Sequence, residues 1–236
     1  MPTRVENEIL VHHVITENPY LDWFSSAEEG PSNAQVKELI IQMSVLLQES
    51  VIIRRKRGIV AEKADYYISD TRFREWLQAV ANAMPIDVEK DLKGHILGSV
   101  ALATRETTHA LHQLGRTYGS SNERKRAGAS FALGIWAGYG LGKAGGKNFL
   151  YQIIDGIRRH NIARRHPKGL PVFSDTPFSM PFYPEQVNAE RVLRQMKELH
   201  EFDVSHDADW FFGAKQALDA LWVFWFGLDK RKFTLA

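Results

Sequence analysis

Apolar residues recur along most of the chain at the three- and four-residue spacing of a helix face, and alternating strand-like runs are nearly missing. The clearest run follows Ser32, where Gln35 three residues later completes the pattern of a capping box. The apolar positions of this run are Val36, Leu39, Ile40, Met43, Leu46 and Leu47. The spacing predicts a long amphipathic helix that begins after Ser32 and buries this face.

Similar patterns, interrupted by proline, glycine and capping residues, predict six further helices. With the run after Ser32 as the second, the predicted helices span residues 6–16, 32 onward, 71–84, 87 to about 118, 120 or 121 onward, 148–163, and 184 to about 228. Between the last two, residues 164–183 contain four prolines and no periodicity, which predicts a long loop. We therefore expect an all-α fold, a single bundle of about seven helices formed by residues 1–236.

Composition limits the classes of protein to which the chain can belong. Its 236 residues are 44% hydrophobic and 25% charged, as in a soluble globular protein. Thirty Lys and Arg against 28 Asp and Glu leave a net charge of +2, which gives no electrostatic case for binding nucleic acid. Cysteine is absent, which excludes disulfides, zinc–thiolate sites, iron–sulfur clusters and a cysteine nucleophile.

Neither the N-terminus nor the most apolar stretch indicates a membrane protein. The first residues lack the basic-then-apolar layout of a signal peptide. The stretch from Trp210 to Leu228 contains Lys215 and Asp219, which interrupt it too often for a membrane span. We expect a cytoplasmic protein without a membrane partner.

Two histidine-containing triplets are candidate metal ligands. Glu106, His109 and His112 form E-x-x-H-x-x-H on the fourth predicted helix, and His200, Asp203 and His206 form H-x-x-D-x-x-H on the last one. Two helices that each offer a carboxylate and histidines match the di-iron and di-manganese sites of helical bundles. Oxygen and nitrogen ligands without sulfur suit iron, or alternatively manganese. Each triplet alone is more often a solvated pair on a helix, so both interpretations stay open.

The fifth predicted helix carries a stripe of glycines. Gly134, Gly138, Gly142 and Gly146 recur every four residues, with Gly140 and Gly145 beside them. Glycine in a helix interior costs about 1 kcal/mol relative to alanine, so a stripe of this kind needs a structural reason. Either another helix approaches closely along it, or a flat and bulky ligand lies against the backbone.

Three segments, in order along the chain, resemble the heme-oxygenase-like superfamily, and the resemblance is closest to its di-iron oxidases. The similar segments are Asn18-Pro19-Tyr20-Leu21-Asp22-Trp23-Phe24, Glu106-x-x-His109 with Leu114-Gly115, and His200 to Gly227-Leu228. The resemblance implies a heme-oxygenase-like helical domain that uses iron and O₂ to oxidise a small organic substrate, with electrons from an unidentified donor. The metal ligands it implies are Glu106, His109, His200, Asp203 and His206, of which Glu106, His109 and His206 are also the expected catalytic residues. Dimers are common in the superfamily, so a homodimer is compatible with it.

The chain departs from the di-iron pattern at one ligand. The family places a bridging carboxylate on the helix where this chain has Leu141, Gly142 and Lys143, and the nearest acid downstream is Asp155. Asp155 replaces the carboxylate, an exogenous ligand fills its place, or the protein binds one metal ion or none.

Two other functions are open. The run from Tyr139 to Gly146 resembles the distal helix of true heme oxygenases, and His13 followed by Glu17-Asn18 resembles their heme-ligand segment. On this alternative His13, Tyr139 and Gly142 contact heme, although Gly142 stands where those enzymes have an Asp. The last alternative is a catalytically inactive helical interaction protein.

Overall fold

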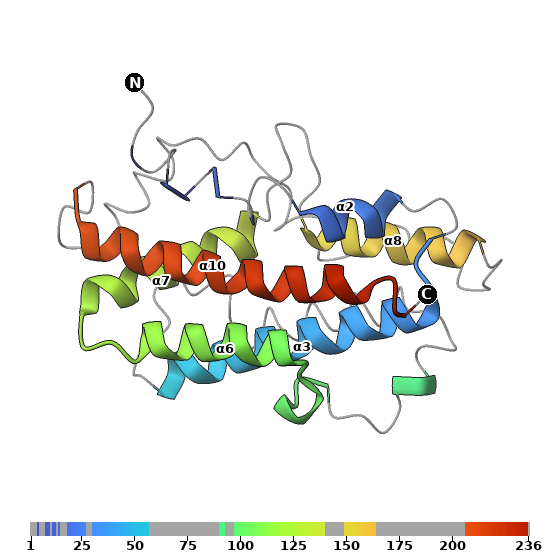
Figure 1. Ribbon diagram of the computed structural model, residues 1–236, viewed down its shortest axis with the longest axis horizontal. Helices are drawn as coiled ribbons and strands as arrows, with labels where there is room; N and C mark the ends of the chain where they lie inside the picture. The colour runs from blue at the N-terminus through green and yellow to red at the C-terminus, as the bar shows by residue number, and fades with distance from the viewer. Residues whose placement is uncertain are drawn as a thin grey trace.

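A computed structural model describes part of the chain, drawn as ribbons in Figure 1. The described residues are 4, 8–9, 11–12, 14, 18–26, 30–56, 90–92, 97–139, 149–163 and 206–235. Their main elements are α2 (Pro19–Ser26), α3 (Asn33–Lys56), the 3-10 helix η3 (Val100–Leu102), α6 (Arg105–Tyr118), α7 (Glu123–Tyr139), α8 (Phe149–Ala163) and α10 (Ala208–Arg231). This described part is helical and holds no β-strand, which confirms the predicted all-α fold class.

The capping box predicted at Ser32 begins α3. The backbone N–H of Ser32 donates to Gln35 Oε1 over 2.6 Å, and the backbone N–H of Gln35 donates to Ser32 Oγ over 3.2 Å. All six apolar positions that the sequence marked on this helix are buried. Both the start of α3 and its buried face are therefore confirmed.

The long fourth helix predicted from residue 87 to about 118 is wrong as one element. Gly98 adopts φ +86°, and α6 begins at Arg105 after the extended residue Thr104. Thr104 accepts a hydrogen bond from the backbone N–H of Thr107 and so caps α6. A left-handed glycine followed by a strong capping residue restarts the helix, and the apolar periodicity of the sequence does not reveal this restart.

The last predicted helix is also divided. His206 and Asp207 are not helical, and α10 begins at Ala208 and ends at Arg231. Asp207 caps it, because its carboxylate accepts from the backbone N–H of Trp210 over 2.9 Å. The predicted third helix at 71–84 and the predicted loop at 164–183 lie outside the described residues.

The predicted bounds of the helix at 148–163 and the predicted start of the helix before it agree closely with the structure, whereas the predicted helix at 6–16 is not continuous, because Val11 and His12 are not helical. α8 covers Phe149–Ala163, where the sequence predicted 148–163. α7 begins at Glu123, a little after the predicted Ser120 or Ser121. Asn122 shifts this start, because its side-chain oxygen accepts from the backbone N–H of Lys125 over 3.3 Å.

α10 is the central helix of the described part. It packs against both α6 and α7, while α2 packs mainly against α8, as Figure 1 shows. Trp210, Phe224 and Trp225 of α10 are fully buried and join the apolar face of α3 in one core. None of the described helices is both long and apolar enough to cross a lipid bilayer. This arrangement fixes α6, which carries the first predicted ligand triplet, along the side of α10.

Candidate functional site

Glu106 lies where the start of α6 meets the end of α10. A Cβ atom built on Gly227 would lie 2.4 Å from Glu106 Cβ, so the Glu106 side chain occupies the space that this glycine leaves. The buried Gln42 of α3 holds the same end of α6, accepting from the Thr104 N–H over 3.0 Å and donating to the Leu102 carbonyl over 2.9 Å. Glu106 is half-buried in this position.

His109 and His112 lie on the outer face of α6. Both residues are exposed. The side-chain amide nitrogen of Gln113 lies 3.3 Å from His109 Nε2, within hydrogen-bond distance. His109 therefore has a described hydrogen-bond partner one turn along its own helix.

His206 lies at the far end of α10 from Glu106. It is exposed and immediately precedes Asp207, the capping residue of α10. Glu106 packs at Gly227, and the 20 residues between Asp207 and Gly227 extend about 30 Å along a helix. The structure therefore does not bring His206 together with Glu106 and His109.

The two remaining predicted ligands of the last helix, His200 and Asp203, lie outside the described residues. Glu106 and His109 cannot share a metal site with His206, so this part of the five-ligand set does not fit the structure.

The remaining predicted site residues are not placed in detail. His13 and Gly142 lie outside the described residues, as do Gly145 and Gly146. Tyr139 is the last residue of α7, and Asp155 belongs to α8, but their side chains are not described. α8 packs mainly against α2, whereas Glu106 lies on α6. Among the described residues, no group of three or more His, Asp or Glu side chains is arranged to hold a metal ion.

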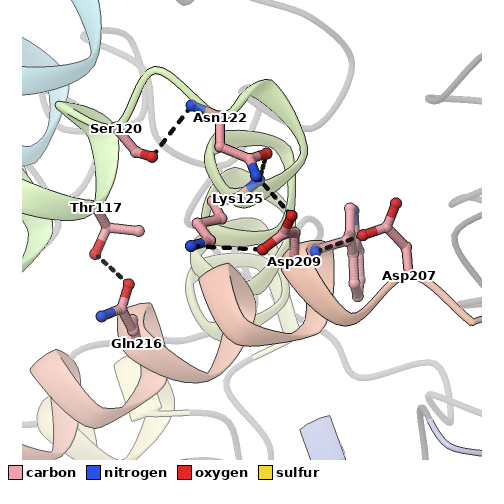
Figure 2. Close-up of polar contacts among 8 residues, drawn as sticks. Thr117, Ser120, Asn122, Lys125, Asp207, Asp209 and Gln216 are labelled. Carbon is pink, nitrogen blue, oxygen red and sulfur yellow. Dashed lines mark hydrogen bonds and ion pairs between the residues drawn. The ribbon is translucent and has the colours of Figure 1, made fainter.

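The structure instead brings together polar residues at the turn between α6 and α7 and the start of α10 (Figure 2). Asn122 donates to the Asp209 carboxylate over 2.7 Å, and Lys125 Nζ lies 3.4 Å from the same group. Arg124 pairs with Asp207 over 2.7 Å, and the Asp207 side chain is only 4% exposed. The carboxylates of Asp207 and Asp209 are each bound by a cation, and that of Asp209 also by an amide donor. The cluster therefore joins three helices, and neither carboxylate is available for catalysis.

A second unpredicted contact joins the N-terminal segment to α10. His12 Nδ1 accepts from the Val14 N–H over 3.3 Å, so Nε2 carries the proton and donates to Asp219 over 3.0 Å. Burial raises the pKa of Asp219, but hydrogen bonds from His12 and Lys215 outweigh it and hold that pKa below its usual range. Both ring nitrogens of His12 are engaged, so this pair fixes the segment and does not form a general base.

A third cluster lies where α10 ends against α2 and α3. Arg231 Nε is 3.1 Å from Glu38 Oε1. Burial raises the pKa of Glu38, and the positive charge of Arg231 opposes this change only in part. Burial, together with the charges of Glu38 and Asp229, also raises the pKa of the Tyr20 phenol, which therefore stays neutral. Ser32 and Gln35 donate to the Leu235 and Lys232 carbonyls, so this cluster anchors the C-terminal residues.

The outer face of α6 carries a row of basic side chains, of which the two arginines are permanently charged. The row consists of Arg105, His109, His112 and Arg116, and all four residues are exposed. These positions follow one another at i, i+4, i+7 and i+11, so they share one face of the helix. None of the four forms an ion pair with a described residue. We call this row the α6 cation row; its spacing is readable in the sequence once the bounds of α6 are known.

Comparison with models of protein families, with curated proteins and with solved structures finds no match for this chain.

Proposed function

We propose that this chain is a helical interaction protein, which binds a partner through the outer side of α6 and α10. The observation that carries the proposal is the α6 cation row, whose four exposed side chains have no described acidic partner. Unpaired surface charges on one face of a helix steer association and select the partner by its charge.

Many described cations on other elements are paired with a carboxylate, although Arg126 and Lys230 are not. Each of seven cations lies within 4 Å of a carboxylate in the pairs Arg4–Glu8, Lys37–Asp91, Arg124–Asp207, Lys125–Asp209, Lys215–Asp219, Arg231–Glu38 and Lys232–Asp229. Arg105 and Arg116 of the α6 cation row, in contrast, have no described carboxylate partner, on a chain whose net charge is only +2.

The helices behind the row support a binding role, because they hold it in place. Gln42 fixes the start of α6, and Thr117 near its end donates to Gln216 of α10 over 3.4 Å. A recognition surface on a helix that is fixed at both ends loses little conformational entropy on binding.

An iron-dependent oxidase or oxygenase is the second candidate function. Glu106 is the observation that favours it, because a half-buried carboxylate with His109 one turn further along the helix can contribute two ligands to one metal ion. The complete set inferred from the sequence does not fit, since His206 lies too far from Glu106. We therefore derive no catalytic step through a metal ion.

Metal analysis of the purified protein separates these functions. Protein produced with iron in the medium is analysed for iron per chain, and its absorption spectrum is recorded before and after addition of hemin. We expect iron well below one ion per chain, unchanged in Glu106→Ala and His206→Ala variants, and no Soret band. About two iron ions per chain that both variants lose would establish the oxidase instead, in line with bundle di-iron sites. A Soret band lost in His13→Ala would establish the heme alternative.

A further inference from the structure

The surface beside the α6 cation row contains exposed aromatic side chains. Phe212 and Phe226 of α10 are 49% and 47% exposed, although α10 is the central helix. They lie 14 residues apart, or two heptads, and therefore share one face of α10 about 21 Å long. A pair of exposed phenylalanines on one helix face is the apolar element of a helix-binding surface.

α6 and α10 run in opposite directions where they touch. Near its start, α6 places Glu106 against Gly227, which lies near the end of α10. Near its end, α6 places Thr117 within 3.4 Å of Gln216, eleven residues earlier on α10. The contact is therefore antiparallel, and Figure 1 shows the two helices side by side.

The cation row and the two phenylalanines lie on the same side of this helix pair. Consecutive residues of an α-helix are rotated by about 100° about its axis. On α6 the exposed Arg105 and Arg116 each directly precede a residue that contacts α10, so they lie about 100° around the helix from the contact with α10. On α10 the exposed Phe226 likewise precedes Gly227, which contacts α6. On both helices the exposed residue comes directly before the residue in contact, so the turn from the contact to the exposed face has the same sense along each chain direction. Because the two helices run in opposite directions, this turn places both exposed faces on the same side of the pair.

We propose that this composite surface binds an acidic amphipathic helix of a partner protein, a proposal that rests on the interaction function proposed above. The α6 cation row spans 11 residues, about 16 Å, beside the phenylalanine row of about 21 Å. A helix of about five turns is long enough to reach along both rows, and its path lies next to His12, which bonds to Asp219 between the two phenylalanines. Its apolar side chains would contact Phe212 and Phe226, and its carboxylates would pair with the cation row. Lys230, 4.6 Å from the ring of Phe226, adds a positive charge beside the apolar row, whereas Lys125, 4.9 Å from the ring of Phe212, is paired with Asp209.

The charges favour a protein helix over two other anionic partners. Asp219 lies between the two phenylalanines on α10, and a carboxylate at that position opposes insertion among anionic lipids. Only two members of the cation row are permanently charged, whereas stable binding to nucleic acid usually takes several phosphate contacts. A protein helix can place carboxylates beside the α6 cation row and apolar groups beside the two phenylalanine rings, so it matches both the charged and the apolar part of the surface.

Fluorescence anisotropy with a designed peptide tests this surface. The probe is a labelled helical peptide with leucines seven residues apart on one face and glutamates on the neighbouring face. We expect saturable binding that weakens with added salt. The double variants Arg105→Ala/Arg116→Ala and Phe212→Ser/Phe226→Ser should each weaken binding about tenfold or more. Lys37→Ala and Phe233→Ser change a half-buried cation and the 72% exposed Phe233 elsewhere, and should leave binding unchanged.

Four outcomes would overturn the proposal. The first is that the peptide does not bind at about 0.1 mM. The second is that a peptide with lysines in place of the glutamates binds equally well, and the third is that neither double variant weakens binding. The fourth is that the double variants lose more affinity for phosphatidylserine vesicles or for an oligonucleotide than for the peptide. Size-exclusion chromatography of the same variants detects self-association, and a dimer that dissociates in Phe212→Ser/Phe226→Ser would assign the surface to a second copy. Iron per chain is measured on the same preparation, so failure of this surface is distinguishable from failure of the proposed function.

Discussion

The backbone of Lys125 in α7 occupies the space that a side chain at Gly213 in α10 would need. A Cβ atom at Gly213 would lie 2.0 Å from the Lys125 carbonyl oxygen, and one at Gly128 would lie 1.9 Å from the Trp210 carbonyl oxygen. Each helix therefore presents a glycine to the backbone of the other. This reciprocal contact places the start of α10 against the start of α7 and fixes the polar cluster of Figure 2.

Substitution at this crossing should be costly. Gly213→Ala brings a methyl group into contact with backbone atoms, which cannot move aside as a flexible side chain can. We expect a loss of about 2 kcal/mol or more in the free energy of unfolding, measured by chemical denaturation. Gly115→Ala in α6 is the matched control, because its Cβ would meet nothing within 4 Å. That variant should gain up to about 1 kcal/mol from helix propensity, and a similar loss in both variants would contradict the crossing.

The cap of α10 provides a second prediction. Asp207 is buried, accepts from the Trp210 N–H over 2.9 Å and pairs with Arg124 over 2.7 Å. Asp207→Ala removes both interactions and should lower the free energy of unfolding by about 1–2 kcal/mol. Asp207→Asn keeps a capping oxygen and loses only the ion pair, so it should cost less than about 1 kcal/mol. If Asn destabilises the protein as much as Ala, the ion pair and not the cap holds this end of α10.

Local features of the sequence predicted the fold class and several helix ends. The capping box at Ser32 and Gln35 and the apolar face of α3 depend on residues within a few turns of one another, and both are confirmed. The start of α10 was missed because the apolar spacing continues through His206. Asp207 acts there as a cap and is paired with Arg124, which lies 83 positions away in the sequence.

The candidate site depends on the position of one helix along the axis of the other. The spacing of residues within a single helix does not specify this position. The two triplets were each suitable for a metal ion, but α6 lies antiparallel to α10 and meets its far end. Glu106 therefore packs against Gly227, about 30 Å along α10 from His206. The contact between His12 and Asp219 was equally hidden, because 207 positions separate the two residues.

Glu38 should make stability depend on pH in one direction. Burial raises its pKa in the folded protein, so the folded state holds the proton more tightly than the unfolded chain does. The stabilisation is present below the unfolded pKa, about 4.3, and is lost as the pH rises through the folded pKa. Glu38→Gln should therefore gain in unfolding free energy relative to the parent protein between about pH 4 and 7. Urea denaturation at several pH values measures this difference. A Glu38→Gln variant that loses stability relative to the parent protein as the pH rises would contradict the prediction.

The opposite sign is expected at Asp219. Hydrogen bonds from His12 and Lys215 lower its pKa in spite of burial, so the folded state favours the ionised carboxylate. This stabilisation is present above the unfolded pKa, about 3.9, and is lost as the pH falls through the lower folded pKa. Asp219→Asn should therefore be less stable than the parent protein at pH 7, and the difference in unfolding free energy should vanish in strong acid.

Lys215→Met is the matched control, because it removes one donor to Asp219 and keeps the 3.0 Å contact with His12. We expect a smaller pH-dependent difference for this variant than for Asp219→Asn. Limited proteolysis at pH 7 adds an independent measurement, since Asp219→Asn weakens the hydrogen bond that holds His12 on α10. If Asp219→Asn is cleaved faster near the N-terminus and Lys215→Met is cleaved at about the rate of the parent protein, the hydrogen bond between His12 and Asp219 holds the N-terminal segment on α10. Equal cleavage of all three proteins would mean that the buried Ile9 and Val14 hold the segment without it.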